Sequence, residues 1–332
     1  MNKNKNVKNH FLKVILIFLL FEIFVALRIK NEYNQIFNSN NTIDVFTKES
    51  QLNLFENEIE KEFKLKGYVN LNAIESSLSF GRKWKTYHFH SHEINVGSSL
   101  DPNFILETII TTASVIASQK PTTKLRLHFS VVKKFKAKHM IKIYSLRSRI
   151  REDVEFNFYN ASRVEGELNS ISDRGTGLTA KLLLPQLLDD SIKKLILIDN
   201  GDLLVLKDLS IMYNWDMKNN IYMGVPDIGA RLYGKISKKK IEVYINVGHY
   251  LIDVQKVKKK NMYNQFLKYR NIYGPPFAEQ YLINDLANGE IGYLPIEFGL
   301  VQPFSNDKLF FNKRKNPIYK SSSDLNNLFI KI

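Results

Sequence analysis

The chain has 332 residues, of which 44% are hydrophobic and 24% charged, a composition typical of a globular protein that buries a sizeable core. It contains no cysteine, which excludes disulfides, iron–sulfur clusters and zinc sites built from thiolates. The formal net charge of +15 suits a diphosphate or acidic lipid headgroups, but the lysine runs lack the interleaved aromatic residues of a base-stacking surface, so we expect no nucleic-acid partner.

The N-terminal residues have the pattern of a membrane-directed segment. Three lysines precede an apolar run at 11–27, which Lys13 and Glu22 interrupt. Basic residues before such a run hold the N-terminus in the cytosol. We therefore predict a cytosolic tail and signal anchor at 1–29, with the rest of the chain lumenal, as in a single-pass type II protein of the Golgi or endoplasmic reticulum membrane. The unbroken part, 14–21, is short for a spanning helix, so a cleaved signal peptide and a buried helix are the alternatives.

The sequence changes character between residues 85 and 93. Residues 30–85 are polar, with sparse apolar positions and no clear period, and we interpret them as a stem that contains helix at 52–63. From about residue 93 short apolar runs alternate with helical stretches, which predicts a βα-type sheet. We expect one α/β domain at 86–310 and a C-terminal tail at 311–332.

The first strand of this domain is expected at 94–96. Asp101 and Pro102 then supply an N-cap and a first helical residue. The spacing of apolar residues predicts the next helix at 105–116. Further strands are expected at 125–132, 154–158 and 195–198, and further helices at 135–146 and 178–188. The run at 195–198 is continuously apolar, as in a central parallel strand that is covered on both faces.

This apolar strand ends in the acidic segment Asp199-Asn-Gly-Asp202. Open α/β sheets bind ligands beyond the carboxyl ends of their strands, and two carboxylates there can hold a divalent cation through hard oxygen ligands. A carboxylate-bound Mn²⁺ or Mg²⁺ would offset the charge that develops on a leaving nucleotide. The alternative is an Asn-Gly turn between two strands, with both carboxylates solvated.

The order of these segments resembles glycosyltransferase family 8, the glycogenin-like and lipopolysaccharide galactosyltransferase-like enzymes. The similar stretches are Ile94–Phe104, Thr179–Pro185, Ile198–Val205, Gly224–Asp227, Ile245–Val254, Glu279–Asn284 and Gly292–Pro295. The resemblance implies a single doubly wound nucleotide-diphospho-sugar transferase domain of the GT-A type. It also implies a retaining enzyme that uses Mn²⁺ (or Mg²⁺) and transfers a hexose or pentose from a UDP-sugar to a glycan or glycoprotein acceptor.

The resemblance assigns nucleotide and metal roles to residues at the matched positions. Asp101 and Phe104 would hold the uridine, the latter by stacking. Lys181 stands where the family has an arginine that reaches the donor. Asn200 aligns with the first aspartate of the family's Asp-x-Asp motif and is assigned to the nucleotide, while Asp199 and Asp202 would form a widened metal-binding pair. The alternatives are a core side chain for Phe104 and a surface lysine for Lys181.

The resemblance also assigns the sugar and the reacting centre. Asn246 and Gly248 lie in a stretch that resembles the family's Asn-Ser/Ala-Gly turn, whose asparagine holds the donor sugar. Asp227 and Glu279 match carboxylates close to the sugars. Gln280 matches a glutamine near the anomeric carbon, so Gln280, Glu279 and Asp227 are the expected catalytic residues.

One motif departs from the family. Its members usually end with His-x-x-Gly-x-x-Lys-Pro-Trp, which supplies a metal ligand and a diphosphate contact, whereas no histidine follows His249 here. This departure motivates an alternative function: a catalytically inactive family member that binds nucleotide-sugar or glycan as a partner protein. The net charge and the apolar N-terminal run motivate a third, a basic membrane-associated binding module.

Overall fold

The computed structural model describes residues 49–78, 92–132, 135–164, 177–199, 203–227, 243–273, 279–298 and 329–331. The chain divides into two units, Met1–Glu49 and Ser50–Ile332, and the fold described here is that of the second. The anchor predicted at 1–29 lies outside the described residues.

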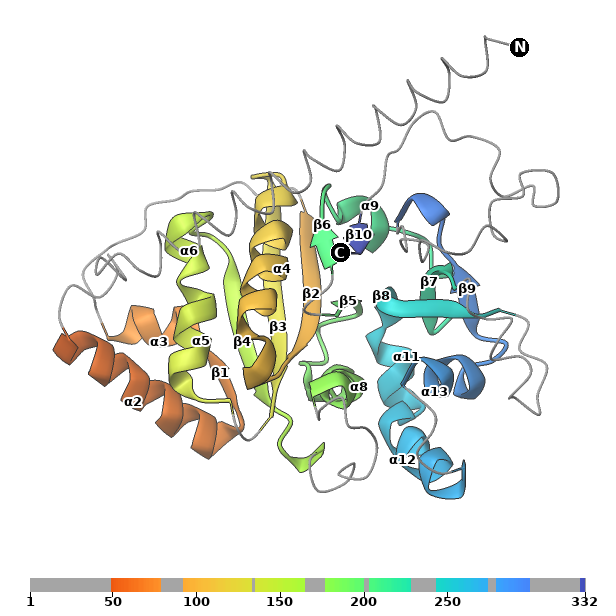
Figure 1. Cartoon of the computed structure of the whole chain (residues 1–332), viewed down its shortest axis with the longest axis horizontal. Helices are drawn as coiled ribbons and strands as arrows, with labels where there is room; N and C mark the ends of the chain where they lie inside the picture. The colour runs from red at the N-terminus through yellow and green to blue at the C-terminus, as the bar shows by residue number, and fades with distance from the viewer. Residues whose placement is uncertain are drawn as a thin grey trace, which may run out of the picture. The chain divides into compact units, whose positions relative to one another are not determined.

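An eight-stranded mixed sheet forms the centre of this unit (Figure 1). Its strands, in spatial order, are β1 (Tyr68–Asn70), β4 (Glu155–Asn160), β3 (Thr123–Val131), β2 (His92–Leu100), β5 (Lys194–Ile198), β8 (Ile245–Asp253), β7 (Tyr222–Pro226) and β9 (Ile291–Tyr293). Strands β2 to β5 are parallel, whereas β8 is antiparallel to β5 and β7. The chain runs outward from β2 through β3 to β4 and returns to β5 on the other side of β2. The carboxyl ends of β2 and β5 therefore form a topological switch point, where open α/β sheets bind ligands.

Helices cover both faces of this sheet. The α-helices are α2 (Glu49–Lys66), α3 (Leu71–Ser77), α4 (Ile105–Ser118), α5 (Ala137–Tyr144), α6 (Leu146–Arg149), α8 (Gly177–Leu187), α9 (Ser210–Tyr213), α11 (Val254–Lys259), α12 (Met262–Tyr273) and α13 (Glu279–Leu286). Two short strands, β6 (Leu203–Val205) and β10 (Phe329–Lys331), pair apart from the main sheet. Figure 1 shows α4 and α5 along one face of β2 to β4. Helix α8 lies on the opposite face, where a Cβ on Gly97 would approach Leu184 Cδ2 to 2.8 Å, so glycine permits this packing.

The predicted strands and helices of the domain are confirmed, except that one predicted helix is divided into two. The strands expected at 94–96, 125–132, 154–158 and 195–198 are β2, β3, β4 and β5. The helix expected at 135–146 is divided at Ser145 into α5 and α6. Strand β5 is buried as its apolar sequence predicts, with Leu195 to Ile198 at most 1% exposed. The mixed α/β architecture predicted from the sequence is thus present.

Residues 49–78 belong to the folded domain rather than to the stem predicted at 30–85. Helix α2 includes the helix expected at 52–63, and it buries Phe55 and Ile59, both 0% exposed. These two residues are one helical turn apart and share a face, so few apolar positions suffice to dock the helix. Strand β1 then pairs with β4, with Tyr68 opposite Tyr159.

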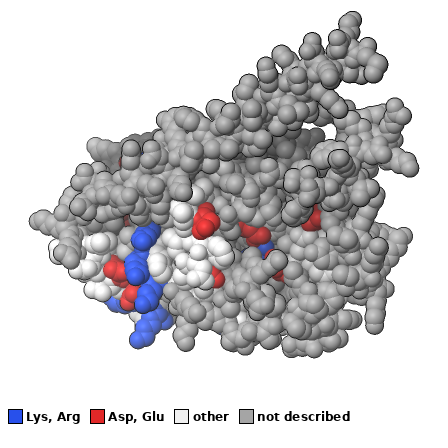
Figure 2. Space-filling model, in the orientation of Figure 1, with Lys and Arg blue, Asp and Glu red and all other residues white. Residues whose placement is uncertain are grey.

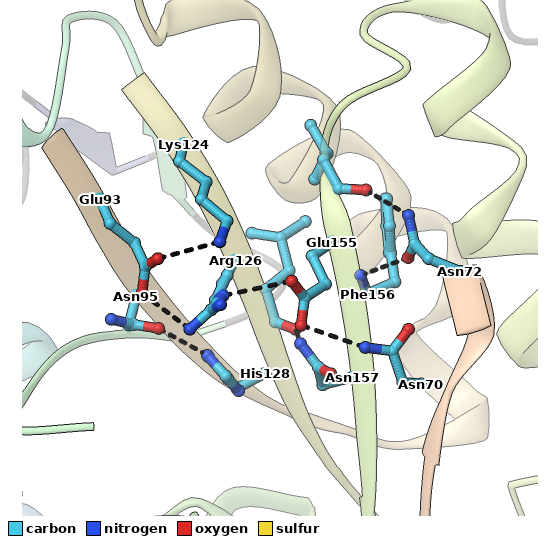
Figure 3. A network of polar contacts seen from close by, with 12 residues as sticks. Asn70, Asn72, Glu93, Asn95, Lys124, Arg126, His128, Glu155, Phe156 and Asn157 are labelled. Carbon is cyan, nitrogen blue, oxygen red and sulfur yellow. Dashed lines mark hydrogen bonds and ion pairs between the residues drawn. The ribbon is translucent and has the colours of Figure 1, made fainter. Parts of the chain in front are cut away.

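A network of polar side chains ties the amino-terminal ends of the parallel strands together (Figure 3). Arg126 on β3 lies between two carboxylates, 2.8 Å from Glu93 on β2 and 3.2 Å from Glu155 on β4. Asn70 on β1 donates to Glu155 at 3.1 Å. Opposite charges on neighbouring strands favour one register, because a slip by one residue would move them to the other face. This edge is the one away from the switch point.

His128 is a buried neutral histidine in the same half of the sheet. Its ring nitrogens lie 3.1 Å from Tyr159 Oη and 2.9 Å from Asn95 Oδ1. Burial, helped by the charge of Arg126, lowers the pKa of His128 from 6.5 to about 3. The folded state therefore resists protonation of a group that the unfolded chain protonates readily.

Because of His128, the free energy of unfolding is expected to decrease as the pH is lowered. Its contribution is fully present above pH 6.5 and is lost as the pH falls toward 3, by up to about 1.4 kcal/mol for each pH unit. Urea unfolding of the wild type and of His128→Gln between pH 7.5 and 4 measures it, and the variant should show a flatter pH dependence. Equal pH dependence in both proteins would assign the effect to other groups.

Candidate active site

Seven of the residues predicted to form the site come together at the carboxyl end of β5. They come from α8, β5, the segment after β7, β8 and α13: Lys181, Asp199, Asp227, Asn246, Gly248, Glu279 and Gln280. Hydrogen bonds and ion pairs connect them in two groups, one around Lys181 and one around Asp227. The charged side chains comprise three carboxylates and one ammonium, so the cluster has an excess of negative charge.

Lys181 is completely buried on α8, with 0% of its side chain exposed. Its Nζ lies 2.6 Å from Asp199 Oδ1, 3.3 Å from Glu279 Oε1 and 3.4 Å from the carbonyl oxygen of Val247. Burial alone would lower the pKa of Lys181, but the carboxylates of Asp199 and Glu279 raise it above its usual value. The lysine is therefore a charged internal cation.

This position contradicts the alternative interpretation from the sequence, because Lys181 is not a surface lysine. Its assignment to the nucleotide stays a prediction. An ammonium has three N–H donors, and the three acceptors around Lys181 account for all of them. The ammonium is thus held between the two carboxylates and a backbone carbonyl.

Asp199 begins the segment that follows β5. Its backbone N–H donates to the carbonyl of Gly248 at 2.7 Å, and its side chain is 19% exposed. A Cβ on Gly248 would lie 2.9 Å from Asn246 Oδ1 and 4.0 Å from Asp199 Oδ2, so glycine keeps this corner open. Asp199 therefore presents a partly exposed carboxylate at the switch point.

The donor chemistry of Asp199 fits a hard divalent cation, which prefers carboxylate oxygens. Two neighbouring residues of the predicted site lie outside the described residues: Asp202, expected to share the metal, and Asn200, expected to contact the nucleotide. Within the described part of the chain, no three or more His, Asp or Glu side chains cluster as a metal site. Asp199 is thus the described member of the predicted metal pair.

Asp227 organises the amide side chains of the site. Its Oδ2 accepts hydrogen bonds from Gln280 Nε2 at 2.6 Å and from Asn246 Nδ2 at 3.1 Å. Asn246 Oδ1 in turn accepts from the N–H of Gly248 at 2.8 Å, and Gln280 Oε1 accepts from the N–H of Val247 at 3.3 Å. Each amide is therefore held at both ends.

The turn expected at 245–248 is an irregularity within β8. Pairing with β7 passes from Gly224 opposite Tyr250 to Pro226 opposite Ile245, so β8 has the extra residues of a bulge. Bulges re-aim side chains next to functional sites. Here the bulge places Asn246 beside Asp227.

Asn284 is a buried residue beside the site to which the sequence analysis assigns no role. It is 0% exposed on α13, one turn after Gln280, and bonds to both backbone groups of Ile245, at 2.8 Å and 3.0 Å. It also donates to the carbonyl of Gln280 at 2.7 Å. Asn284 thereby fixes α13 to β8. Its spacing of four residues from Gln280, which places the two on one helix face, was the available sequence signal.

Asp101 and Phe104 lie at the carboxyl end of β2, which neighbours β5. Asp101 caps the 3₁₀ turn Pro102–Phe104 by accepting from the N–H of Asn103 at 2.9 Å, which confirms the expected N-cap. Phe104 is 45% exposed, so it is not the core side chain of the alternative interpretation. An exposed ring at this edge is available to a ligand.

Comparison with known proteins identifies the family of this fold. Residues 95–321 match the family model of glycosyl transferase family 8, and the chain belongs to this family. It is therefore a glycosyltransferase by family, which confirms the resemblance derived from the motifs. No curated protein matches the chain significantly.

Solved structures share the fold at low sequence identity. One is the galactosyltransferase LgtC in complex with donor and acceptor sugar analogs, with a TM-score of 0.58 and 19% identity over 72% of this chain and 86% of that one. Another is the WbbM bifunctional glycosyltransferase, with a TM-score of 0.57 and 16% identity over 93% of this chain and 59% of that one. Their sheets are thus built on the same plan.

None of the helices within the described ranges combines the length and the apolar character needed to cross a membrane.

Proposed function

We propose that this protein is a retaining glycosyltransferase that transfers a hexose or pentose from a UDP-sugar to a glycan or glycoprotein acceptor with the help of Mn²⁺ or Mg²⁺. The observation that carries the proposal is the convergence of Asp199, Asp227, Glu279 and Gln280 at the switch point of a family 8 fold. Family membership supports the transfer of a glycosyl group. The positions of the residues support the roles in binding and catalysis that we assign to each of them.

The donor would lie along the carboxyl ends of β2 and β5 and the amino-terminal end of β8. Phe104 offers its exposed ring to the uracil and Asp101 its carboxylate to the uridine, with Asn200 assigned to the nucleotide. The donor sugar would face Asn246, Asp227 and Glu279, and the missing side chain of Gly248 leaves room for it. Hydrogen bonds made before the donor arrives lower the cost of ordering these groups.

The metal would be held by Asp199 and Asp202. The ion would supply positive charge that stabilises the departing diphosphate. Lys181 engages Oδ1 of Asp199, so Oδ2 is the oxygen that faces away from the lysine pairing. By pairing with Asp199 and Glu279 together, Lys181 holds a metal-binding carboxylate and a sugar-binding carboxylate in a fixed relation.

Gln280 would act at the anomeric carbon. An amide is a poor nucleophile, so we assign it the stabilisation of positive charge on the sugar ring through its carbonyl dipole. In a front-face reaction the proton of the acceptor hydroxyl passes to the departing phosphate oxygen, so no separate protein base is required. Asp227 and the N–H of Val247 hold the Gln280 amide at its two ends and so orient it.

A donor screen tests the proposal. Purified protein is incubated with Mn²⁺ and single UDP-sugars, and free UDP is measured. Release of UDP from one donor, which EDTA abolishes, is the expected result. Release from no donor, with or without candidate acceptors, would contradict an active enzyme.

A second function rests on the departure at the C-terminal motif. A family member without that histidine and lysine could bind nucleotide-sugar and act as a partner protein. Calorimetric binding of UDP in the presence of Mn²⁺, without turnover of any donor, would favour this inactive member. Binding to acidic vesicles that salt weakens, without binding of UDP, would instead favour the membrane-associated binding module.

Truncation of Phe104 tests the uridine site. Phe104→Ala is expected to weaken UDP binding by about 1–3 kcal/mol, because a stacked ring contributes that much for each base. Since the ring is 45% exposed, the melting temperature should change little. Ile211→Ala, at another residue that is 61% exposed, is the control and should leave UDP affinity unchanged. Full UDP affinity in Phe104→Ala would remove this residue from the site.

We also propose that residues 1–29 anchor the protein as a type II membrane protein of the Golgi or endoplasmic reticulum, with the catalytic domain in the lumen. The basic residues before the apolar run at 11–27 support it. Protease added to intact microsomes should spare everything after about residue 28, and detergent should remove that protection. Digestion of the domain in intact microsomes would contradict lumenal placement.

A further inference from the structure

A groove of about 460 Å³ lies at the carboxyl ends of β3 and β4, apart from the residues assigned to the donor. It is bounded by the second half of α2 and by the start of α5, and we name it the α2–α5 groove. Its volume falls within the range of small-molecule sites. It opens on the same sheet edge as the candidate active site, the edge where α/β sheets bind ligands.

The floor of the groove is apolar. Ile59 from α2, Val132 and Phe135 after β3, and Met140 from α5 line it, each at most 5% exposed. Phe63 completes the wall on the α2 side. These four side chains are nearly buried and form a firm floor, so the apolar surface that an alkyl or isoprenoid chain would remove from water is mainly that of the partly exposed Phe63.

The rim of the groove is basic. Lys61, Lys64 and Lys136 line it together with a single acid, Glu60. Lys61 is paired with Glu58 at 3.2 Å. Among the described residues, Lys64 and Lys136 have no ion-pair partner. Figure 2 shows a row of basic side chains in the region where α2 ends and α5 begins. The excess charge on the rim favours an anion.

Polar side chains also support an anion at this rim. Asn160 and Ser162 also line the groove, and they supply an amide and a hydroxyl that can donate to phosphate oxygens.

We propose that the α2–α5 groove binds an amphiphilic phosphate, a phosphate monoester or diester joined to an alkyl or isoprenoid chain. The chain lies on the apolar floor and the phosphate lies between Lys64 and Lys136. A concave site that is lined on both sides holds one such molecule, whereas a flat basic surface would bind the headgroups of a whole bilayer. Binding here requires neither UDP nor turnover, so it stands independently of the function proposed above.

Calorimetry with small probes tests the inference on the purified full chain. The probes are n-octyl phosphate below its micellar concentration, inorganic phosphate, and n-octyl glucoside. We expect n-octyl phosphate to bind at least about tenfold more tightly than either of the others, because only it engages both floor and rim. The double variant Lys64→Glu/Lys136→Glu should weaken this binding at least about tenfold, a loss of about 1.4 kcal/mol.

The matched control is Lys66→Glu/Lys138→Glu, which makes the same charge change on the same two helices beside the groove. It should retain n-octyl phosphate binding, and melting temperatures should show that both double variants fold. Equal losses in the two double variants would show a diffuse electrostatic effect and overturn the site. Binding to vesicles with acidic lipids, without binding of monomeric n-octyl phosphate, would overturn it in favour of a membrane surface.

Discussion

Replacing Lys181 with methionine is expected to destabilise the domain by about 3–5 kcal/mol, because it removes the cation from a largely buried charge group. Methionine fills similar space, so the loss should arise from charge rather than from a cavity. Asp199 and Glu279 are only 19% and 15% exposed, and both would lose the ammonium that pairs with them. Urea unfolding at pH 7.5 in EDTA measures the effect.

The surface pair of Lys66 and Glu62 supplies the control. Their separation of 2.6 Å is the same as that of Lys181 and Asp199, but Lys66 is 63% exposed. Lys66→Met should therefore cost less than about 1 kcal/mol. A comparable cost for both lysines would show that Lys181 is not a special internal cation.

A metal titration of the same variants distinguishes loss of charge from loss of packing as the cause of the destabilisation. With Lys181 absent, Mn²⁺ should raise the melting temperature more than it does in the wild type, because the carboxylates no longer share an internal cation. Adding Glu279→Gln to Lys181→Met should restore part of the stability, since one negative charge is removed. If Mn²⁺ stabilises the wild type and the variant equally, Lys181 does not hold the metal-binding carboxylate.

The buried position of Lys181 was beyond the reach of sequence analysis. The spacing of leucines at 182, 183 and 187 predicts α8 and its apolar side, but a lysine next to them is usually exposed. It is buried here because Asp199 and Glu279, each from a different element, converge on it. Such a pairing depends on tertiary placement, which local pattern does not contain.

The strands also differ in how far the local sequence predicts them. Strand β5 was predictable because four consecutive apolar residues favour a strand that is covered on both faces. Strand β1 has only three residues, and its partner β4 lies far along the chain, as the bond from Tyr68 to Asn157 illustrates. With so little periodicity, its polar surroundings favoured the interpretation as a stem.

The sequence predicted which residues form the candidate site better than it predicted the contacts that each of them makes. The family-like motifs selected Asp227, Asn246 and Gln280, which the structure joins by hydrogen bonds. The motifs did not indicate that Asp227 accepts both amides, because the contact depends on the bulge in β8. That arrangement makes Gln280 the most informative residue for the chemistry.

Replacing Gln280 with alanine is expected to lower kcat by about 10²–10³-fold, the loss typical when one preorganised stabilising group is removed. In the proposed mechanism the contact of Gln280 with the reacting centre strengthens as positive charge develops on the sugar, so donor affinity should change little. Initial rates at saturating donor, together with the Kd of the UDP-sugar donor in Mn²⁺, give the two quantities. Gln265→Ala, an exposed glutamine on α12, is the control and should leave both unchanged.

The split between kcat and Kd decides the role of Gln280, because this residue also holds Asp227 and the backbone of Val247. Equal losses in turnover and in donor binding would make Gln280 a positioning residue that shapes the sugar site. Unchanged kcat would remove it from the mechanism. If the wild type binds UDP with Mn²⁺ but turns over no donor, the inactive family member is the better description, and the amide then serves only to order the ligand-binding bulge of β8.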